Sequence, residues 1–502
     1  TQFLPKGGEA RQASRPKLSS AAAAGGTSPK MVAPRRQLCG CFLFLLMFAM
    51  APRTVSSKLV TSLPGFHGRL PFNLHTGYVE VDEGTELFYY FVQSEARAQE
   101  EAPFLLWLTG GDHCSVFSGL ANEIGPIRFV VEPYNGSIPR LQINPNSWTK
   151  VAHILFVDSP VGAGFSYSRR PRGYEVGDVS SSVQIHDFLI KWFSDHPKYL
   201  QNPFYIGGDS YAGKLVPFIV HIISQGIEAG NTPVLNLKGY LVGNPSTGEI
   251  IDISSKVPYA HGVGIISDQL YETILGHCQG LDYLLPSNAP CAKALDTFNH
   301  LMSQVQQAQI LLDNCVYASS APTRPAADDT KAEYSGDAGR RILVGNPPAR
   351  PPFGCVTYKN YLSYFWANAE ATRDALGIKE GSVEEWVRCH DGDLPYYIDL
   401  RSSIEYHRNV TANLGYRALV YSGDHDAVVP HLGTQAWIRS LGFPVVHDWR
   451  AWHLNGQSAG FTLTYSNNMT FSTIKGGGHT APEYEPERCF AMFSRWILGE
   501  PL

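Results

Sequence analysis

Five short, largely apolar runs recur along this chain, and each stops at a glycine, serine, threonine or aspartate. They lie at residues 104–108, 154–157, 204–206, 237–242 and 418–421. Runs of this length are typical of strands that are buried on both faces, and helical stretches separate them. This alternation predicts an α/β fold with a mainly parallel central sheet flanked by helices. Functional side chains are expected where such strands end.

Residues 246–365 interrupt this alternation. They contain four cysteines, an amphipathic stretch at 292–312 and a polar, proline-rich segment at 319–352. We interpret them as an inserted helical cap, with 319–352 as a disordered loop that is open to proteolysis. The sheet domain then has two parts, residues 58–245 and residues 366–502.

The N-terminal residues carry targeting signals. Residues 1–30 do not begin with methionine and are rich in small and basic residues, which predicts a disordered leader that is not native. From Met31, two arginines precede an apolar run at 38–51, which is the pattern of a cleaved signal peptide over residues 31–57. A membrane anchor is the alternative, but the run is shorter than the ~20 residues that span a bilayer. We expect a secretory protein, extracellular or vacuolar, without a stable membrane anchor.

Sequons and cysteines agree with secretion. The three Asn-x-Ser/Thr sequons at Asn135, Asn409 and Asn468 are candidate glycosylation sites. Seven cysteines remain after the signal peptide, which predicts three disulfides and one free thiol. No C-x-x-C pair occurs, so we expect no metal and no other cofactor. The net charge of -5, without a basic stripe, argues against a nucleic-acid partner.

A candidate nucleophile, Ser210, lies between a predicted strand and an apolar helical run. A serine at a sharp strand-to-helix turn needs small residues on both sides, here Gly208 and Ala212. The N-terminus of the following helix adds partial positive charge. Alone, this motif fits an ordinary loop serine equally well.

Two later loops supply a candidate acid and base. Asp424 and Asp426 follow the strand at 418–421, and we favour Asp426 because the turn glycine precedes it by three residues. The structural alternative is that both aspartates cap the next helix. His479 follows three glycines, which let its imidazole approach a serine. We expect His425 to be a surface residue.

The order serine, aspartate, histidine is that of α/β-hydrolases. In such a triad Ser210 attacks a carbonyl, His479 takes and returns the proton, and Asp426 orients the imidazole. The oxyanion needs two backbone N–H groups. We expect these from Tyr211, directly after the nucleophile, and from Gly111, after the run at 104–108.

As a set, these motifs resemble the serine carboxypeptidase family, in particular its plant acyltransferase-like branch. The resemblance begins at about Leu63 and rests on LPGFHGRLPF, WLTGG, EIGP, FVDSPVGAGFSYS, GGDSYAGK, GYLVGNPSTG, YSGDHDAVVP and GGGHTAPEY. It implies an α/β-hydrolase fold with a helical cap. It also implies the disulfides Cys114–Cys389, Cys278–Cys291 and Cys315–Cys355, with Cys489 free.

Two chemistries occur in this family. Its carboxypeptidases hold the terminal carboxylate of a peptide with an asparagine before the Gly-Gly pair and a glutamate before the nucleophile. Here these positions are Thr109, which precedes Gly110, and Asp209, so the resemblance implies that all three bind substrate but grip a carboxylate weakly. The same residues are typical of the acyltransferase branch, which moves acyl groups from 1-O-glucose esters to an alcohol or amine. We favour the acyltransferase over a carboxypeptidase that acts on peptide C-termini.

One stretch departs from the family pattern. Where the family usually reads Gly-Gly-Pro-Gly-Cys-Ser, residues 110–115 read Gly-Gly-Asp-His-Cys-Ser, which predicts a different loop conformation. A carboxylate at Asp112 would oppose a developing oxyanion unless it points outward or pairs with His113. A catalytically silent binding protein on the same scaffold is therefore a third hypothesis. The sequence leaves the oligomeric state open.

Overall fold

The computed structural model describes residues 57–96, 98–111, 113–315, 347–390 and 392–502. The predicted leader, the predicted signal peptide up to residue 56, Asp112 and most of the segment 319–352 lie outside the described residues. The described residues all belong to one unit, Thr54–Leu502. Among them, no helix combines the length and the apolar character needed to cross a bilayer.

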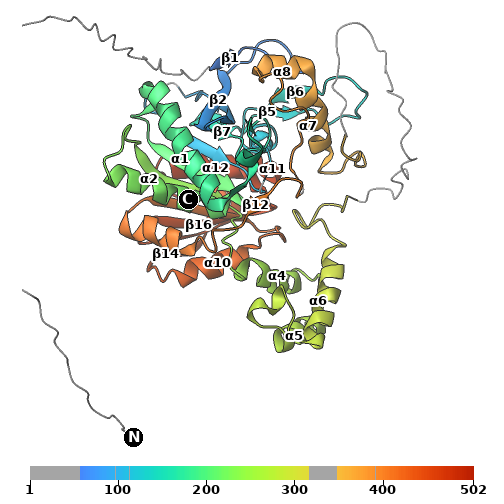
Figure 1. Ribbon diagram of the computed structural model, residues 1–502. Helices are drawn as coiled ribbons and strands as arrows, with labels where there is room; N and C mark the ends of the chain where they lie inside the picture. The colour runs from blue at the N-terminus through green and yellow to red at the C-terminus, as the bar shows by residue number, and fades with distance from the viewer. Residues whose placement is uncertain (1–56, 97, 112, 316–346, 391) are drawn as a thin grey trace, which may run out of the picture. The chain divides into compact units, whose positions relative to one another are not determined.

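Within the described residues, the largest element is a 12-stranded sheet (Figure 1). Its strands are β1 (Lys58–Val60), β2 (Leu74–Asp82), β3 (Thr85–Val92), β4 (Phe104–Leu108), β7 (His153–Val157), β8 (Tyr167–Ser168), β10 (Phe204–Asp209), β11 (Leu237–Gly243), β13 (Arg417–Gly423), β14 (Val445–Leu454), β15 (Gln457–Tyr465) and β16 (Met469–Ile474). Their order is β1-β2-β3-β7-β4-β10-β11-β13-β16-β15-β14, and β8 pairs with β3. Two small sheets pair β5 (Ile127–Phe129) with β6 (Leu141–Ile143) and β9 (Val176–Gly177) with β12 (Tyr396–Tyr397).

The middle of the large sheet is parallel, and its flanks are antiparallel. Strands β7, β4, β10, β11, β13 and β16 pair in parallel. Strands β1 to β3 and the β14–β15 hairpin extend the sheet in antiparallel fashion. The parallel strands all end at the same edge, and this edge carries the candidate site.

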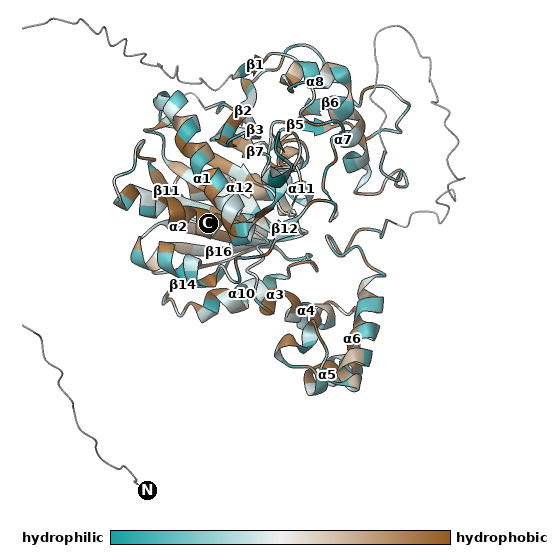
Figure 2. Cartoon of the chain, in the orientation of Figure 1, coloured by the Kyte–Doolittle hydropathy of each residue, from teal (hydrophilic) through white to brown (hydrophobic). Residues whose placement is uncertain are grey.

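Twelve α-helices occur among the described residues, and several of them cover the two faces of this sheet. They are α1 (Asp178–Asp195), α2 (Ala212–Glu228), α3 (Ile251–Ser254), α4 (Lys256–Gly262), α5 (Asp268–His277), α6 (Ala289–Met302), α7 (Tyr358–Asn368), α8 (Glu370–Leu376), α9 (Ile404–Arg408), α10 (His431–Ser440), α11 (Ala481–Tyr484) and α12 (Pro486–Ile497). Strand β4 is buried along its whole length, and its residues alternate between two apolar cores. Side chains of α1, α2 and α10 complete one core, and those of α7 and α12 complete the other. Figure 2 shows α1 with interleaved hydrophilic and hydrophobic residues, as expected of a helix with one buried face.

Two strands extend two or more residues past their predicted C-terminal ends. Strand β10 continues past residue 206 to Asp209, and β13 continues past residue 421 to Gly423. Glycines 207 and 208 remain in the ladder because neighbouring groups leave no room for a side chain: a Cβ on Gly208 would lie 2.8 Å from Ala212 Cβ. Strand β10 therefore ends directly before Ser210.

Residues between β11 and β13 contribute helices α3 to α9 and, among described residues, no strand of the large sheet. Helices α4, α5 and α6 enclose a small apolar core of their own, which includes Val257, Ile274 and Phe298. The helix predicted over 292–312 is wrong at its C-terminal end, because α6 stops at Met302. Beyond it, backbone groups of residues 307–310 bond to loops at the end of the sheet instead of continuing the helix.

Of the three disulfides, Cys114–Cys389 joins the most distant parts of the sequence. Within the described residues they are Cys114–Cys389, Cys278–Cys291 and Cys315–Cys355, the same three pairs that the resemblance implied. Cys489 is a free, buried thiol.

Candidate active site

Ser210 occupies the turn between β10 and α2 in a conformation that is uncommon for residues other than glycine. Its φ is +55°, and such strain is retained where the surroundings determine it. Its N–H group donates to the Gly243 carbonyl at 2.9 Å, and its own carbonyl accepts from the N–H groups of Gly213 and Ser246, both at 3.0 Å. These bonds hold the nucleophile rigidly at the edge of the sheet.

Three candidate residues from separate loops meet at this edge. His479 Nε2 lies 2.7 Å from Ser210 Oγ, and His479 Nδ1 lies 2.9 Å from Asp426 Oδ2. Ser210 follows β10, Asp426 follows β13 and His479 follows β16. The geometry allows Ser210 to donate its proton to Nε2 while Nδ1–H donates to the carboxylate.

Further donors fix the Asp426 carboxylate, which is fully buried. Asn244 Nδ2 donates to Oδ2 at 2.7 Å, and the Val428 N–H group donates to Oδ1 at 2.7 Å. Helix α10 begins only at His431, with Pro430 at its N-cap, so Asp426 does not cap that helix. Several donors hold this buried carboxylate in one orientation.

Asp424 lies away from this arrangement. Its Oδ1 is 2.6 Å from His425 Nδ1 and accepts from the Gly476 N–H group at 2.8 Å. His425 is partly exposed, with 27% of its side chain accessible, and it pairs with Asp424. Through the bond to Gly476 the pair supports the loop that carries His479. Among the described residues, neither side chain forms a hydrogen bond with the His479 imidazole.

Electrostatics favour the protonated form of His479. Burial alone would lower the pKa of the imidazole, but the charge and hydrogen bond of Asp426 outweigh it, and the pKa rises above its usual value. The base therefore loses its proton at a higher pH than an isolated histidine.

A pair of carboxyl groups, Asp209 and Glu123, lies beside the nucleophile, and of the two only Glu123 was missed in the sequence. Burial raises the pKa of Asp209 to about 6, although the charge of His479 and the Gly110 N–H group act in the opposite direction. Glu123, in the π-helical turn Gly119–Glu123, is 3% exposed. Burial and then the charges of Asp209 and Glu483 raise the pKa of Glu123 well above its usual range. One member of the pair thus holds a proton at mildly acidic pH.

The two residues that follow β4, the strand that pairs with β10, face Asp209. The Gly110 N–H group donates to Asp209 Oδ1 at 3.1 Å, and Thr109 Oγ1 lies 3.5 Å from the same oxygen. A Cβ on Gly110 would overlap Ser210 Cβ and lie 2.8 Å from Ser210 Oγ. Thr109, Gly110 and Asp209 therefore surround the nucleophile, and two donors face the protein's own carboxyl group.

The two expected oxyanion donors come from different elements, Gly111 from the loop after β4 and Tyr211 from the start of α2. Gly111 has a φ of +87°, and a Cβ there would overlap the sulfur of Cys114, so only glycine fits. Tyr211 begins α2 as its N-cap residue, and its side chain turns away toward Asp178. His113, from the atypical loop, is 1% exposed and packs its ring 5.5 Å from that of Tyr396.

Gly111, Ser210 and His479 open onto a cleft of about 290 Å³. Among the described residues its walls are Thr109, Gly110, Gly111, Cys114, Ser118, Asn122, Glu123, Asp209, Ser210, Gln306, Ala308, Val356, Thr357, Asn360, Arg388, His479, Thr480, Glu483 and Tyr484. No group of three or more metal-ligating side chains occurs among the described residues. Glu123, Asp209 and His479 place polar side chains in this cleft together with Ser210.

The segment after α6 closes one wall of this cleft. The Ala308 carbonyl accepts from the His479 N–H group at 2.6 Å, and the Gln307 carbonyl accepts from the Ala427 N–H group at 2.9 Å. Gln309 Nε2 donates to the Gly476 carbonyl at 2.7 Å. The segment thereby fixes the loops of both Asp426 and His479 from the outside.

The sequons differ in accessibility. Asn135 and Asn468 are exposed, whereas Asn409 is half-buried and Thr411, the hydroxyl residue of its sequon, is 1% exposed. Asn135 Oδ1 accepts from Ser137 Oγ at 2.6 Å within an exposed turn. Asn135 presents the most open geometry for a glycan.

Asn244 and Glu123 were missed because each is a single polar residue far from the triad in sequence. Both stand inside segments that carry the family resemblance, GYLVGNPSTG and EIGP. Asn244 follows β11, one strand away from Asp426's strand, and this placement at a strand end was the available signal.

Comparisons with known proteins agree on one family. The serine carboxypeptidase family model matches residues 64–499. The chain is 46% identical to serine carboxypeptidase-like 19 of Arabidopsis thaliana, over 93% of this chain and all of that protein. It is 44% identical to serine carboxypeptidase-like 7 of the same plant, over 92% of this chain and 98% of that protein.

A solved structure shares the fold. The crystal structure of a prohormone-processing carboxypeptidase, Kex1, from Saccharomyces cerevisiae matches with a TM-score of 0.64 and 17% identity. The match covers 85% of this chain and 91% of the yeast chain.

Proposed function

Because the chain belongs to the serine carboxypeptidase family, we propose that it is an acyltransferase that uses Ser210 to move acyl groups from 1-O-glucose esters to a small alcohol or amine. The observation that carries this proposal is the arrangement of Thr109 and Asp209. The Thr109 hydroxyl and the Gly110 N–H group both face Asp209 Oδ1, so neither is presented to a substrate carboxylate. A neutral glucose ester needs no such grip.

The proposed reaction has two acyl transfers. Ser210 Oγ attacks the ester carbonyl as its proton moves to His479 Nε2, and the Gly111 and Tyr211 N–H groups stabilise the oxyanion. The imidazolium then protonates the leaving glucose oxygen. An acceptor hydroxyl or amine gives its proton to Nε2 and attacks the acyl-enzyme, which restores Ser210. Asp426 orients the imidazole and offsets its positive charge throughout.

Transfer requires that the acceptor outcompete water at the acyl-enzyme. The segment of residues 306–308 lines the cleft beside His479, and its hydrogen bonds to the catalytic loops support a closed wall there. The predicted signal peptide, sequons and disulfides support action in the secretory pathway, in the vacuole or outside the cell.

One observation favours a serine carboxypeptidase as the second candidate. The raised pKa values of Glu123 and Asp209 leave a carboxylic acid beside Ser210 at mildly acidic pH. A protonated acid can donate to the terminal carboxylate of a peptide, which an ionised one would repel. The yeast protein whose solved structure shares this fold is a carboxypeptidase.

The test offers both substrate classes to the purified protein at mildly acidic pH. Phenolic 1-O-glucose esters with alcohol acceptors are mixed in one reaction, and blocked dipeptides are supplied in another, with products read by mass spectrometry. We expect a transfer product that disappears in Ser210→Ala. Release of the C-terminal amino acid without transfer would replace the acyltransferase by the carboxypeptidase, and no product in either reaction would support the silent binding protein.

The pH dependence of KM reports how Asp209 meets a substrate. For a substrate with a free carboxylate, KM is expected to rise above pH 6, by up to about tenfold per pH unit, because Asp209 loses its proton there and repels the carboxylate. For a neutral ester, KM stays flat over the same range. Steady-state kinetics between pH 4.5 and 8, a range of about two units on either side of the Asp209 pKa, measure KM for both substrates. Asp209→Asn should abolish the slope for the carboxylate substrate; an unchanged slope in that variant would show that another group titrates.

A further inference from the structure

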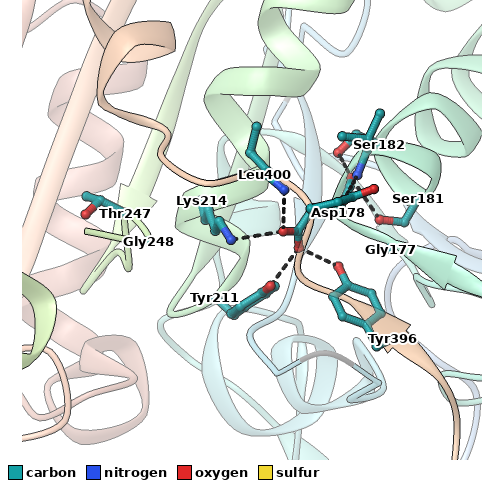
Figure 3. Close-up of polar contacts among 12 residues, drawn as sticks. Gly177, Asp178, Ser181, Ser182, Tyr211, Lys214, Thr247, Gly248, Tyr396 and Leu400 are labelled. Carbon is teal, nitrogen blue, oxygen red and sulfur yellow. Dashed lines mark hydrogen bonds and ion pairs between the residues drawn. The ribbon is translucent and has the colours of Figure 1, made fainter. Parts of the chain in front are cut away.

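A fully buried carboxylate, Asp178, stands behind the nucleophile at the first residue of α1. Figure 3 shows the four donors that converge on it. Tyr211 and Tyr396 donate their hydroxyl protons to Oδ1 at 2.6 and 2.9 Å. Lys214 Nζ and the Leu400 N–H group donate to Oδ2 at 2.9 and 3.1 Å. Every acceptor position of the carboxylate is therefore occupied.

Two of these donors come from the start of the nucleophile helix. Tyr211 directly follows Ser210, and Lys214 lies in the first turn of α2. The Lys214 side chain is 2% exposed, and its ammonium lies 5.4 Å from the centre of the Tyr211 ring. Burying an ammonium without a paired charge costs free energy, so Asp178 holds the Lys214 ammonium beside it. The pair consequently fixes the helix turn whose first N–H group is that of Tyr211.

The other two donors come from residues 392–400, here called the strap. The strap begins three residues after Cys389, whose disulfide partner Cys114 lies against Gly111. Within the strap, β12 pairs in parallel with β9, directly before Asp178. The Tyr211 and Tyr396 rings also meet edge to face, with centroids 6.1 Å apart. Asp178 therefore connects Tyr211, one expected oxyanion donor, to the strap. The strap is connected in turn, through the disulfide of Cys389, to the chain beside Gly111, the other expected donor.

We infer that Asp178, with Lys214, Tyr211 and Tyr396, is a positioning site that sets the distance between the Gly111 and Tyr211 N–H groups. The inference rests on the proposed acyl-enzyme function, because it concerns the oxyanion of that reaction. None of these side chains lines the cleft among its described walls, so their effect reaches the substrate only through backbone position. Oxyanion donors act by preorganisation, and misplacement by about 1 Å costs roughly 100-fold in rate.

The experiment removes one hydroxyl group at a time. Tyr211→Phe and Tyr396→Phe each delete a donor to Asp178 Oδ1 and keep the ring and backbone. Tyr240→Phe is the matched control, because it deletes a buried tyrosine hydroxyl that lies 2.7 Å from His407 Nδ1, away from the site. Acylation is followed as nitrophenolate release from a p-nitrophenyl ester, and thermal unfolding is recorded for each variant.

We expect Tyr211→Phe to lower kcat about tenfold, with KM within about twofold and with a thermal shift like that of Tyr240→Phe. Tyr396→Phe should show the same kcat–KM split to a smaller extent. If Tyr211→Phe keeps the kcat of Tyr240→Phe, the inference is overturned while the acyl-enzyme function stands. If the wild-type protein releases no nitrophenolate, or releases it equally after Ser210→Ala, the proposed function fails and the inference with it.

Discussion

Replacing Asp426 by asparagine is expected to lower kcat about 10⁴-fold without unfolding the protein. The carboxylate accepts from His479 Nδ1 at 2.9 Å, and three further donors fix its orientation. If the new amide turns its NH₂ group to His479, it holds the wrong tautomer. If it turns its oxygen, the imidazolium that forms during reaction lacks a compensating charge. Rates of ester acylation with a circular dichroism spectrum of the variant measure the effect.

Asp424→Asn is the matched control for this variant. Asp424 lies two residues away, is 30% exposed and bonds to His425 and the Gly476 N–H group instead of to His479. We expect it to keep kcat within about tenfold of the wild-type value, because it only supports the His479 loop. Equal losses in the two variants would show that the acid has been assigned to the wrong aspartate, or that both act on the fold.

Replacing Gly110 by alanine is the second change with a large expected effect. The added Cβ would overlap Ser210 Cβ and lie 2.8 Å from Ser210 Oγ and 3.1 Å from the Asp209 carbonyl oxygen. Rotation of the serine cannot relieve the overlap, so the backbone of β10 or of the Gly110 loop must move. We expect kcat to fall at least about 100-fold, because the nucleophile and the Gly111 donor then lose their common geometry.

Gly276→Ala provides the comparison for Gly110→Ala. Gly276 lies in helix α5, and a Cβ there meets open space. Alanine in a helix is favourable, so this variant should keep wild-type kcat and unfold at the same or a slightly higher temperature. Wild-type kcat in Gly110→Ala, measured with the same ester, would contradict the tight packing of the oxyanion loop on Ser210.

The sequence predicts the strands better than their ends. The run at 104–108 matches β4 because five apolar residues between polar turns have few other buried arrangements. The predicted ends of β10 and β13 lie before the observed ones because Gly207, Gly208 and Gly423 are residue types typical of turns. In the fold their missing side chains serve close packing inside the ladder.

Long-range bonds explain the other differences. The helix predicted to 312 ends at Met302 because Gln307, Ala308 and Ile310 bond to the loops of Asp426 and His479, and helical periodicity contains no sign of such partners. The spacing from a turn glycine favoured Asp426, and the structure places Asp426 rather than Asp424 against His479. Glu123 stands in the EIGP segment, which gives it no chemical role; its approach to Asp209 in the folded chain gives it a place in the site.

Transfer of an acyl group through Ser210 is tested most directly by trapping the acyl group on the enzyme. The protein is mixed briefly with a phenolic 1-O-glucose ester, and samples are quenched in acid and digested before and after a chase with an alcohol acceptor or with buffer alone. The mass of the peptide that contains Ser210 is then measured by mass spectrometry. We expect an acyl adduct on Ser210 that the acceptor discharges faster than water, with the acyl group recovered on the acceptor. An adduct on another residue, or discharge by water alone at the same rate with and without acceptor, would contradict transfer through Ser210.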